Sequence, residues 1–110
     1  MVRIGAVVLN VSDMPRAAEF WKAALGYAPS PHNPDFLVPR DADRVRLHLD
    51  TTDRTHLDLW TDSEEEQLAE VERLISLGAT RVEWEYPDDA DFVVLADTEG
   101  TLFCVINTAY

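Results

Sequence analysis

The sequence has a single cysteine, no long hydrophobic run and few basic residues. Cys104 has no partner for an internal disulfide, which is typical of a reducing compartment. The longest apolar segment, Ile4 to Val11, is too short to span a bilayer and lacks the flanks of a signal peptide. These absences predict a cytoplasmic protein that does not cross a membrane.

Basic residues are outnumbered by acidic ones, 9 Lys and Arg against 21 Asp and Glu, so the formal net charge is −12. Such a surface repels nucleic acid and anionic membrane, and neither is expected as a partner. It would attract a cationic ligand, although solubility alone also accounts for it. The chain contains no Gly-rich phosphate loop, no Ser-His-Asp order and no CxxC motif.

The chain of 110 residues, 46% of them hydrophobic, fits one globular domain. Within it, residues 6–13 align with residues 56–63 at an offset of 50, and both segments alternate like half-buried strands. Further on, residues 35–38 align with 91–94 at an offset of 56. The sequence therefore predicts two related modules.

The first strand of each module precedes a helical pattern. In module one, about 1–51, Ser12 or Asp13 can cap the helix and Gly26 can end it. Five apolar residues recur there at helical spacing: Ala17, Phe20, Trp21, Ala24 and Leu25.

Module two, about 52–110, carries the corresponding signals. Ser63 and Glu66 form a capping-box pattern, and Gly78 can end the helix. The residues expected to face inward are Leu68, Val71, Leu74, Ile75 and Leu77.

Strands are expected at 4–11, 27–30, 35–39, 44–50, 55–61, 80–86, 91–96 and 101–107. Turn residues at 41–43 and 98–100 separate paired strands. Each module therefore follows the order βαβββ. The predicted fold class is α+β, with the two tandem modules forming a curved mixed sheet that has its helices on the convex face and a trough on the other face.

Strand alternation decides which residues face this trough. If Val7, Leu9 and Val11 pack on a helix, their neighbours point to the opposite side. Carried through both modules, the same parity places the following polar and aromatic residues in the trough: Asn10, Arg46, His48, Asp50, His56, Asp58, Trp60 and Cys104. They are the predicted ligand-binding residues.

Several loose motifs carry a family resemblance by their order and spacing. They are Val-Leu-Asn-Val-Ser-Asp from position 8, Thr-His-Leu-Asp-Leu from 55, Leu-Gly-Ala at 77–79, and the segment 94–105 around Thr-Glu-Gly-Thr-Leu-Phe-Cys. Over nearly its whole length the chain resembles the vicinal oxygen chelate superfamily, which includes glyoxalases, bleomycin-resistance proteins and extradiol dioxygenases. The resemblance implies a homodimer with a small-molecule site in the trough.

Superfamily members that use a metal place His or Gln in the opening strand of each module and Glu in the closing strand. Here those positions hold Ala6 and His48 in module one, and His56 and Cys104 in module two, so only His56 matches. These departures predict that the usual metal centre is absent. An alternative set, His48, His56 and Cys104, would suit zinc with one open position.

Three functions follow from these residues. The preferred one is metal-free binding of a small molecule, with Trp60, Asp58 and Asp50 available to a cationic ligand. The runner-up is a metal-dependent lyase, transferase or dioxygenase of the glyoxalase kind. In the third, a metal-free enzyme, His56 or His48 is the catalytic general base and Asp58 orients it. The sequence leaves open whether the protein is an enzyme.

Overall fold

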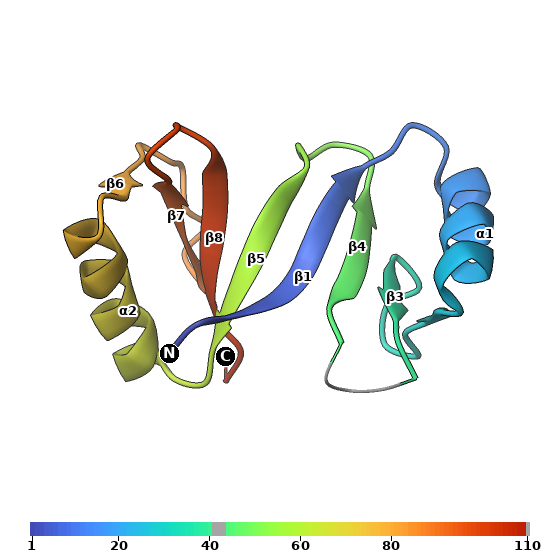
Figure 1. The fold of residues 1–110 in the computed structure, drawn as a ribbon, viewed down its shortest axis with the longest axis horizontal. Helices are drawn as coiled ribbons and strands as arrows, with labels where there is room; N and C mark the ends of the chain where they lie inside the picture. The colour runs from blue at the N-terminus through green and yellow to red at the C-terminus, as the bar shows by residue number, and fades with distance from the viewer. Residues whose placement is uncertain (41–43, 110) are drawn as a thin grey trace. The chain divides into compact units, whose positions relative to one another are not determined.

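The computed structural model describes residues 1–40 and 44–109, and it confirms the α+β class. The turn expected at 41–43 lies outside the described residues. The elements are, in chain order, β1 (Arg3–Asn10), α1 (Met14–Leu25), β2 (Ala28–Pro29), β3 (Phe36–Val38), β4 (Arg46–Asp50), β5 (His56–Thr61), α2 (Glu64–Ser76), β6 (Thr80–Arg81), β7 (Phe92–Ala96) and β8 (Leu102–Asn107) (Figure 1). This order confirms two βαβββ modules.

The chain divides into two compact units, Gly5–Thr55 and His56–Tyr110 together with Met1–Ile4. In the first unit the strand order is β2-β3-β4-β1, with β1 and β4 parallel and the other pairs antiparallel. The second unit repeats this arrangement as β6-β7-β8-β5, with β5 and β8 parallel. Strand β1 crosses the boundary, because its first residues belong to the second unit.

Register within the parallel pairs follows the sequence repeat. Val8 lies opposite His48 in the first unit, and Asp58 lies opposite Cys104 in the second. The offsets of 50 and 56 relate these two pairs, so the expected equivalence of His48 and Cys104 is confirmed. Residues paired in parallel strands share one face of the sheet. Cys104 therefore lies on the same face as Asp58.

The alignment of residues 35–38 with 91–94 is wrong by two positions. Phe36 pairs with His48, but Val94 rather than Phe92 pairs with Cys104. Leu37 and Leu95, each 0% exposed, therefore occupy equivalent core positions. The Asp-Phe motif occurs at the start of both strands, but the two motifs are not structurally equivalent, because β7 has five residues and β3 has three.

Both helices begin and end where the capping residues predict. The Asp13 side chain accepts a hydrogen bond from the Arg16 N–H, and Gly26 ends α1 with φ of 70°. At the start of α2, Ser63 Oγ accepts from the Glu66 N–H at 3.0 Å. The Glu66 carboxylate accepts a hydrogen bond from the N–H of Asp62 at 2.8 Å. In a capping box the donor would be the N–H of the N-cap residue Ser63, one position later.

Helix α1 covers the core of the first unit with only part of the expected stripe, since Ala17 and Trp21 pack there as predicted. The residues that pack on Leu37, Leu47 and Leu49 include Met14, Ala17, Ala18 and Trp21. Phe20 and Leu25, expected to face inward, are 62% and 44% exposed. The predicted stripe was therefore too far toward the C-terminal end of the helix, since Met14 and Ala18 were not recognised as core residues.

Helix α2 buries two polar side chains that the sequence pattern did not predict. Its core partners are Leu95 and Val105, but Leu68 and Leu77 point outward and are exposed, contrary to expectation. Gln67 is buried instead, and its amide donates hydrogen bonds to the carbonyls of Asp91 at 3.0 Å and Val105 at 2.9 Å. Burial of this amide is tolerated because both of its N–H groups are hydrogen-bonded.

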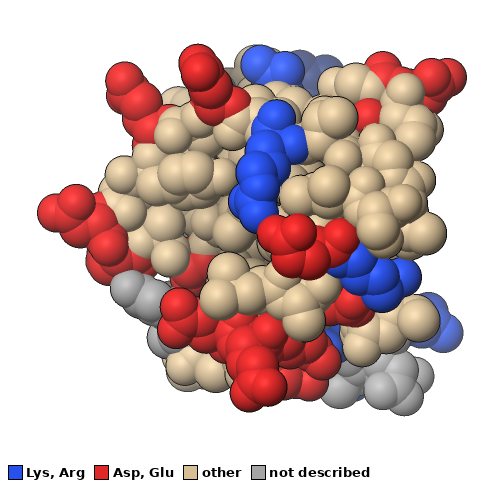
Figure 2. Space-filling view, turned by 90° about the vertical axis from the view of Figure 1, so that its left-hand side faces the viewer, with Lys and Arg blue, Asp and Glu red and all other residues tan. Residues whose placement is uncertain are grey.

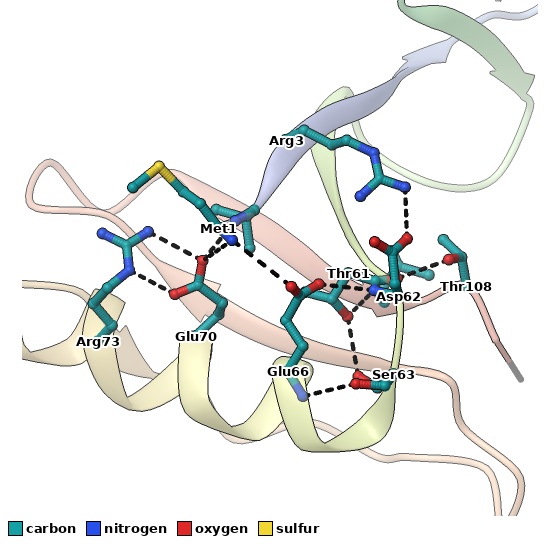
Figure 3. A network of polar contacts seen from close by, with 11 residues as sticks. Met1, Arg3, Thr61, Asp62, Ser63, Glu66, Glu70, Arg73 and Thr108 are labelled. Carbon is teal, nitrogen blue, oxygen red and sulfur yellow. Dashed lines mark hydrogen bonds and ion pairs between the residues drawn. The ribbon is translucent and has the colours of Figure 1, made fainter.

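Glu70, the second buried polar residue of α2, holds the start of the chain (Figure 3). Its Oε1 accepts a hydrogen bond from the Val2 N–H at 2.6 Å, and the carboxylate also pairs with Arg73 and lies 3.6 Å from the Met1 amine. Chiefly through its hydrogen bond, the Arg73 guanidinium holds the pKa of Glu70 below its usual value, and the Val2 N–H adds to this.

Strand β6 is shorter than expected, because it ends at Arg81 rather than continuing to residue 86. Trp84 and Tyr86 lie in the connection that follows, each 42% exposed, and the Tyr86 hydroxyl accepts a hydrogen bond from the Val94 N–H. Among the described residues, no helix combines the length and apolar character needed to cross a membrane.

Gln67→Leu is expected to lower the free energy of unfolding by about 1–3 kcal/mol, since two carbonyl oxygens lose their donor in a buried site. Urea denaturation followed by circular dichroism measures the change. Glu65→Leu introduces the same side chain at an exposed position of α2 and should change the free energy by less than about 0.5 kcal/mol. Equal losses in the two variants would contradict a structural role for the Gln67 amide.

Glu70→Gln is expected to cost about 2 kcal/mol at neutral pH, because the buried charge-assisted hydrogen bonds are weakened. The folded-state pKa of Glu70 is lowered, so its stabilisation is complete above the ordinary value of 4.5 and is lost as pH falls below it. The gap between wild type and variant should therefore close in acid. Denaturation at several pH values tests this, with the exposed Glu72→Gln as control.

Candidate functional site

Three side chains converge on one face of the second unit. His56 and Asp58 are two residues apart on β5, and Cys104 on β8 lies opposite Asp58. Their neighbours Phe103 and Val105 pack toward α2, so the three point away from the helix. One potential ligand atom from each lies within 4.8 Å of the others.

His56 and Asp58 are in direct contact. The distance from His56 Nε2 to Asp58 Oδ1 is 3.2 Å, and the two side chains are 8% and 16% exposed. At this distance the carboxylate can accept a hydrogen bond from the imidazole and orient its ring. Partial burial strengthens the contact, because little water competes for it.

The donor set of this cluster differs from that of the metal-using family members. Ala6 offers no ligand atom, so the four-residue set of the family does not fit the chain. His56, Asp58 and Cys104 supply one nitrogen, one oxygen and one sulfur, which are all zinc ligands. Three protein ligands with an open fourth position are typical of catalytic zinc sites. The residues therefore fit zinc, but in an arrangement confined to one module.

Among the sequence-predicted metal ligands, His48 lies in the first unit. Its ring stacks on Phe36 with 4.1 Å between centroids and 13° between planes. Nε2 lies 3.9 Å from Asp50 Oδ2, and the side chain is 24% exposed. The second unit thus assembles His56 and Cys104 with Asp58, a residue that the sequence assigned to ligand binding but not to a metal. The i, i+2 spacing on β5 was the signal available for it.

Asp50 shapes the turn after β4. Its Oδ1 accepts hydrogen bonds from the Thr52 N–H, the Thr52 hydroxyl and the Asp53 N–H. The N–H groups of Thr52 and Asp53, followed by the Thr52 hydroxyl, lower the pKa of Asp50 from its usual value. Since the ionised carboxylate holds this turn, Asp50 has an evident local function apart from any ligand.

Asn10 and Arg46 are also placed in the first unit. The Asn10 amide donates to the Asp53 carbonyl at 2.7 Å, which fastens the end of β1 to the loop after β4. Arg46 is exposed at the start of β4 and lines a cavity.

Trp60 shares its face of β5 with His56 and Asp58 and is half-buried. The Arg3 guanidinium carbon lies 5.9 Å from the centroid of its ring. This distance is within the range of a cation–π contact. A cationic ligand at this ring would therefore compete with an arginine of the chain itself.

Comparison with known proteins identifies the family. The sequence profile described as Glyoxalase-like domain matches residues 6–106. No curated protein shows significant similarity to the chain.

Solved structures share the fold at low sequence identity. A Legionella pneumophila chain described as an NAD-dependent benzaldehyde dehydrogenase is 16% identical with a TM-score of 0.67, over 93% of this chain and 96% of that one. Methylmalonyl-CoA epimerase from Mycobacterium tuberculosis is 18% identical with a TM-score of 0.60, over 97% and 88%. A methylmalonyl-CoA epimerase in complex with methylmalonyl-CoA and NH4+ is 14% identical with a TM-score of 0.58, over 99% and 96%.

At these identities the structural likeness concerns the fold alone. The profile match, by contrast, spans nearly the whole sequence, and it agrees with the two βαβββ modules. The chain belongs to the glyoxalase-like domain family of the vicinal oxygen chelate superfamily.

Proposed function

We propose that this domain binds a small organic molecule against the face of module two that carries His56, Asp58 and Cys104, without the four-ligand metal centre of its family. The convergence of these three side chains carries the proposal. A few polar groups gathered at one point are what fixes the orientation of a small ligand in a binding site.

The chemistry of the cluster suits a ligand with a polar or acidic hydrogen. The His56 imidazole lies 3.2 Å from the Asp58 carboxylate, and an imidazole oriented in this way suits a group that accepts a hydrogen bond or a proton from a ligand. The half-buried Cys104 thiol adds a soft and weakly polar surface. The same arrangement serves a binding protein or an enzyme that uses His56 as a general base.

The fold supports the ligand class. One structure with this fold is described as a complex with methylmalonyl-CoA, which is an acidic thioester. This chain has the same fold and a polar cluster of its own, so we propose that it also binds a small molecule. The identity of the ligand depends on the side chains of the site, which differ between the two proteins.

Ligand binding should raise the melting temperature, since a ligand at a hundred times its Kd adds about 2.7 kcal/mol to the free energy of unfolding. We expect methylmalonyl-CoA or bleomycin to do so in a thermal-shift assay. Asp58→Asn should remove the shift, because an amide at this position no longer provides the carboxylate that orients His56.

Asp62→Asn is the matched control for this experiment. It makes the same replacement just beyond β5, where Asp62 is exposed and pairs with Arg3 at 2.9 Å, so the ligand-induced shift should persist. The absence of any shift, or equal shifts in both variants, would contradict binding at His56 and Asp58.

The second candidate is a metal-dependent enzyme, favoured by the 4.8 Å spacing of the three donors. His56, Asp58 and Cys104 would hold the metal. Bound there, zinc would polarise a substrate carbonyl or activate water. Asp58 would then be a ligand rather than the partner of His56.

Cobalt titration separates the two candidates, because a cobalt–thiolate bond absorbs in the near ultraviolet whether or not the protein is active. If the metal site exists, wild-type protein binds one equivalent with this absorption, and Cys104→Ser and Asp58→Asn lose it. His48→Ala should retain it, since His48 is outside the proposed set. Loss in His48→Ala and Cys104→Ser, with the absorption retained in Asp58→Asn, would instead support the sequence-predicted set His48, His56 and Cys104. No stoichiometric absorption would exclude a thiolate-bound metal at this cluster.

The homodimer and the cytoplasmic location stay predictions. Sedimentation equilibrium across a range of protein concentrations measures the first. A single species with the 12.4 kDa mass of one chain would contradict it.

A further inference from the structure

Basic residues gather around one cavity of the first unit. The cavity has a volume of about 300 Å³, and its wall includes Arg40, Arg44 and Arg46. The chain has only 9 Lys and Arg residues in total. The described residues of the wall include no Asp or Glu. A neighbouring cavity of about 470 Å³ is also lined by Arg40 and Arg44, and the described residues of its wall likewise include no Asp or Glu.

Several basic side chains elsewhere in the protein are spread singly among carboxylates. Arg3 pairs with Asp62 at 2.9 Å, Lys22 with Glu19 at 2.8 Å, and Arg81 with Glu72 at 2.7 Å. Figure 2, which views the molecule from the side of α2, shows acidic side chains spread over this face with a few basic ones among them. Three arginines around one hollow are therefore unusual for a chain with a net charge of −12.

Like charges placed together repel each other, and a bound anion offsets the repulsion. The guanidinium group also matches the geometry of an oxyanion, since its parallel N–H groups can donate two hydrogen bonds to one carboxylate or phosphate. Because each guanidinium has five N–H donors, an arginine that contacts another part of the chain can still donate to a ligand. Arginine lining a hollow is thus the side chain suited to hold such a group.

The backbone between Arg44 and Arg46 is held by a hydrogen bond from Tyr27. Tyr27 donates a hydrogen bond from its hydroxyl to the Val45 carbonyl at 2.7 Å, between Arg44 and Arg46 in the chain. Pro31 and Pro39 stiffen the cavity wall, because their rings restrict the backbone. A fixed wall reduces the entropy lost when a ligand binds.

We propose that this cavity binds the oxyanion group of a small molecule, a phosphate monoester or a carboxylate, through Arg40, Arg44 and Arg46. Its volume is at the lower end of the range for small-molecule sites and suffices for the anionic group with a short attached part. Every residue involved lies in Gly5–Thr55, whereas the proposed function rests on His56, Asp58 and Cys104. An experiment that disproves one of the two proposals therefore leaves the other unaffected.

Isothermal titration with inorganic phosphate and with acetate, at constant ionic strength, tests the site on the full chain. Saturable binding of one equivalent is expected, and the tighter of the two anions identifies the class of group that is held. Arg44→Gln and Arg46→Gln should each weaken binding by about tenfold, the loss expected when a charge-assisted hydrogen bond is removed. All three arginines are exposed, so the variants should keep the wild-type melting temperature.

Arg81→Gln is the matched control, since it removes the same charge from an exposed residue in the other unit. Its affinity for the anion should equal that of the wild type. Equal weakening in Arg81→Gln and Arg44→Gln would overturn the proposal, because binding would then reflect net charge alone. Absence of saturable binding of either anion would overturn it as well.

Asp41 and Asp43 stand between Arg40 and Arg44 in the sequence and lie outside the described residues. The double variant Asp41→Asn/Asp43→Asn distinguishes a ligand site from a set of internal ion pairs. If the arginines serve a ligand, wild type and double variant both bind the anion. Binding that appears only in the double variant would overturn the proposal, because the arginines would then neutralise the chain's own aspartates.

Discussion

Parallel pairing of the first strand of each module with its last strand determines which side chains meet in this protein. Strands β1 and β4 pair in one unit and β5 and β8 in the other, and each connection between the paired strands includes a helix, α1 or α2. A parallel pair needs such a crossover, and the helix must bury its apolar side on the sheet. The opposite face of the sheet then receives the remaining side chains. His56, Asp58 and Cys104 meet there because β5 and β8 pair in this register.

The same positions carry different chemistry in the two modules. His48 corresponds to Cys104, but it stacks on Phe36 and lies near Asp50, which itself organises a turn. In module two, the corresponding cysteine lies beside a histidine and a carboxylate. One backbone pattern therefore supports a stacked histidine beside a turn-forming carboxylate in the first unit and a cluster of potential ligand atoms around Cys104 in the second.

Much of the fold could be predicted from the sequence because alternation and capping are local signals. Asp13 and Ser63 mark the helix starts, and the offsets of 50 and 56 give the parallel registers. The inward faces of the helices were less predictable. Gln67 and Glu70 are polar, yet both are buried, since backbone partners distant in sequence satisfy them. No periodicity of apolar residues can reveal such partners.

The candidate site could likewise be predicted only in part from the sequence. Strand parity placed His56, Asp58 and Cys104 on one face, but their contact depends on side-chain rotamers. The Cα atoms of residues two apart on a strand are roughly 6–7 Å from each other, so the spacing alone does not establish a contact. Only the structure shows that His56 Nε2 lies 3.2 Å from Asp58 Oδ1. The arginine cavity was not recognised, because Arg40, Arg44 and Arg46 come together with residues 30–32 through the pairing of β2, β3 and β4.

The contact between the Val2 N–H and Glu70, 68 residues apart in the chain, bears on the order of events during synthesis. A ribosome adds residues from the N-terminus onward, so the opening residues leave it long before helix α2 exists. The unit Gly5–Thr55 has its four strands and its helix available early, whereas residues 1–4 must wait for the synthesis of helix α2 and the strands of the other unit. The two units therefore differ in when they can form, because Gly5–Thr55 is one continuous segment whereas the other unit needs residues from both sides of it in the chain.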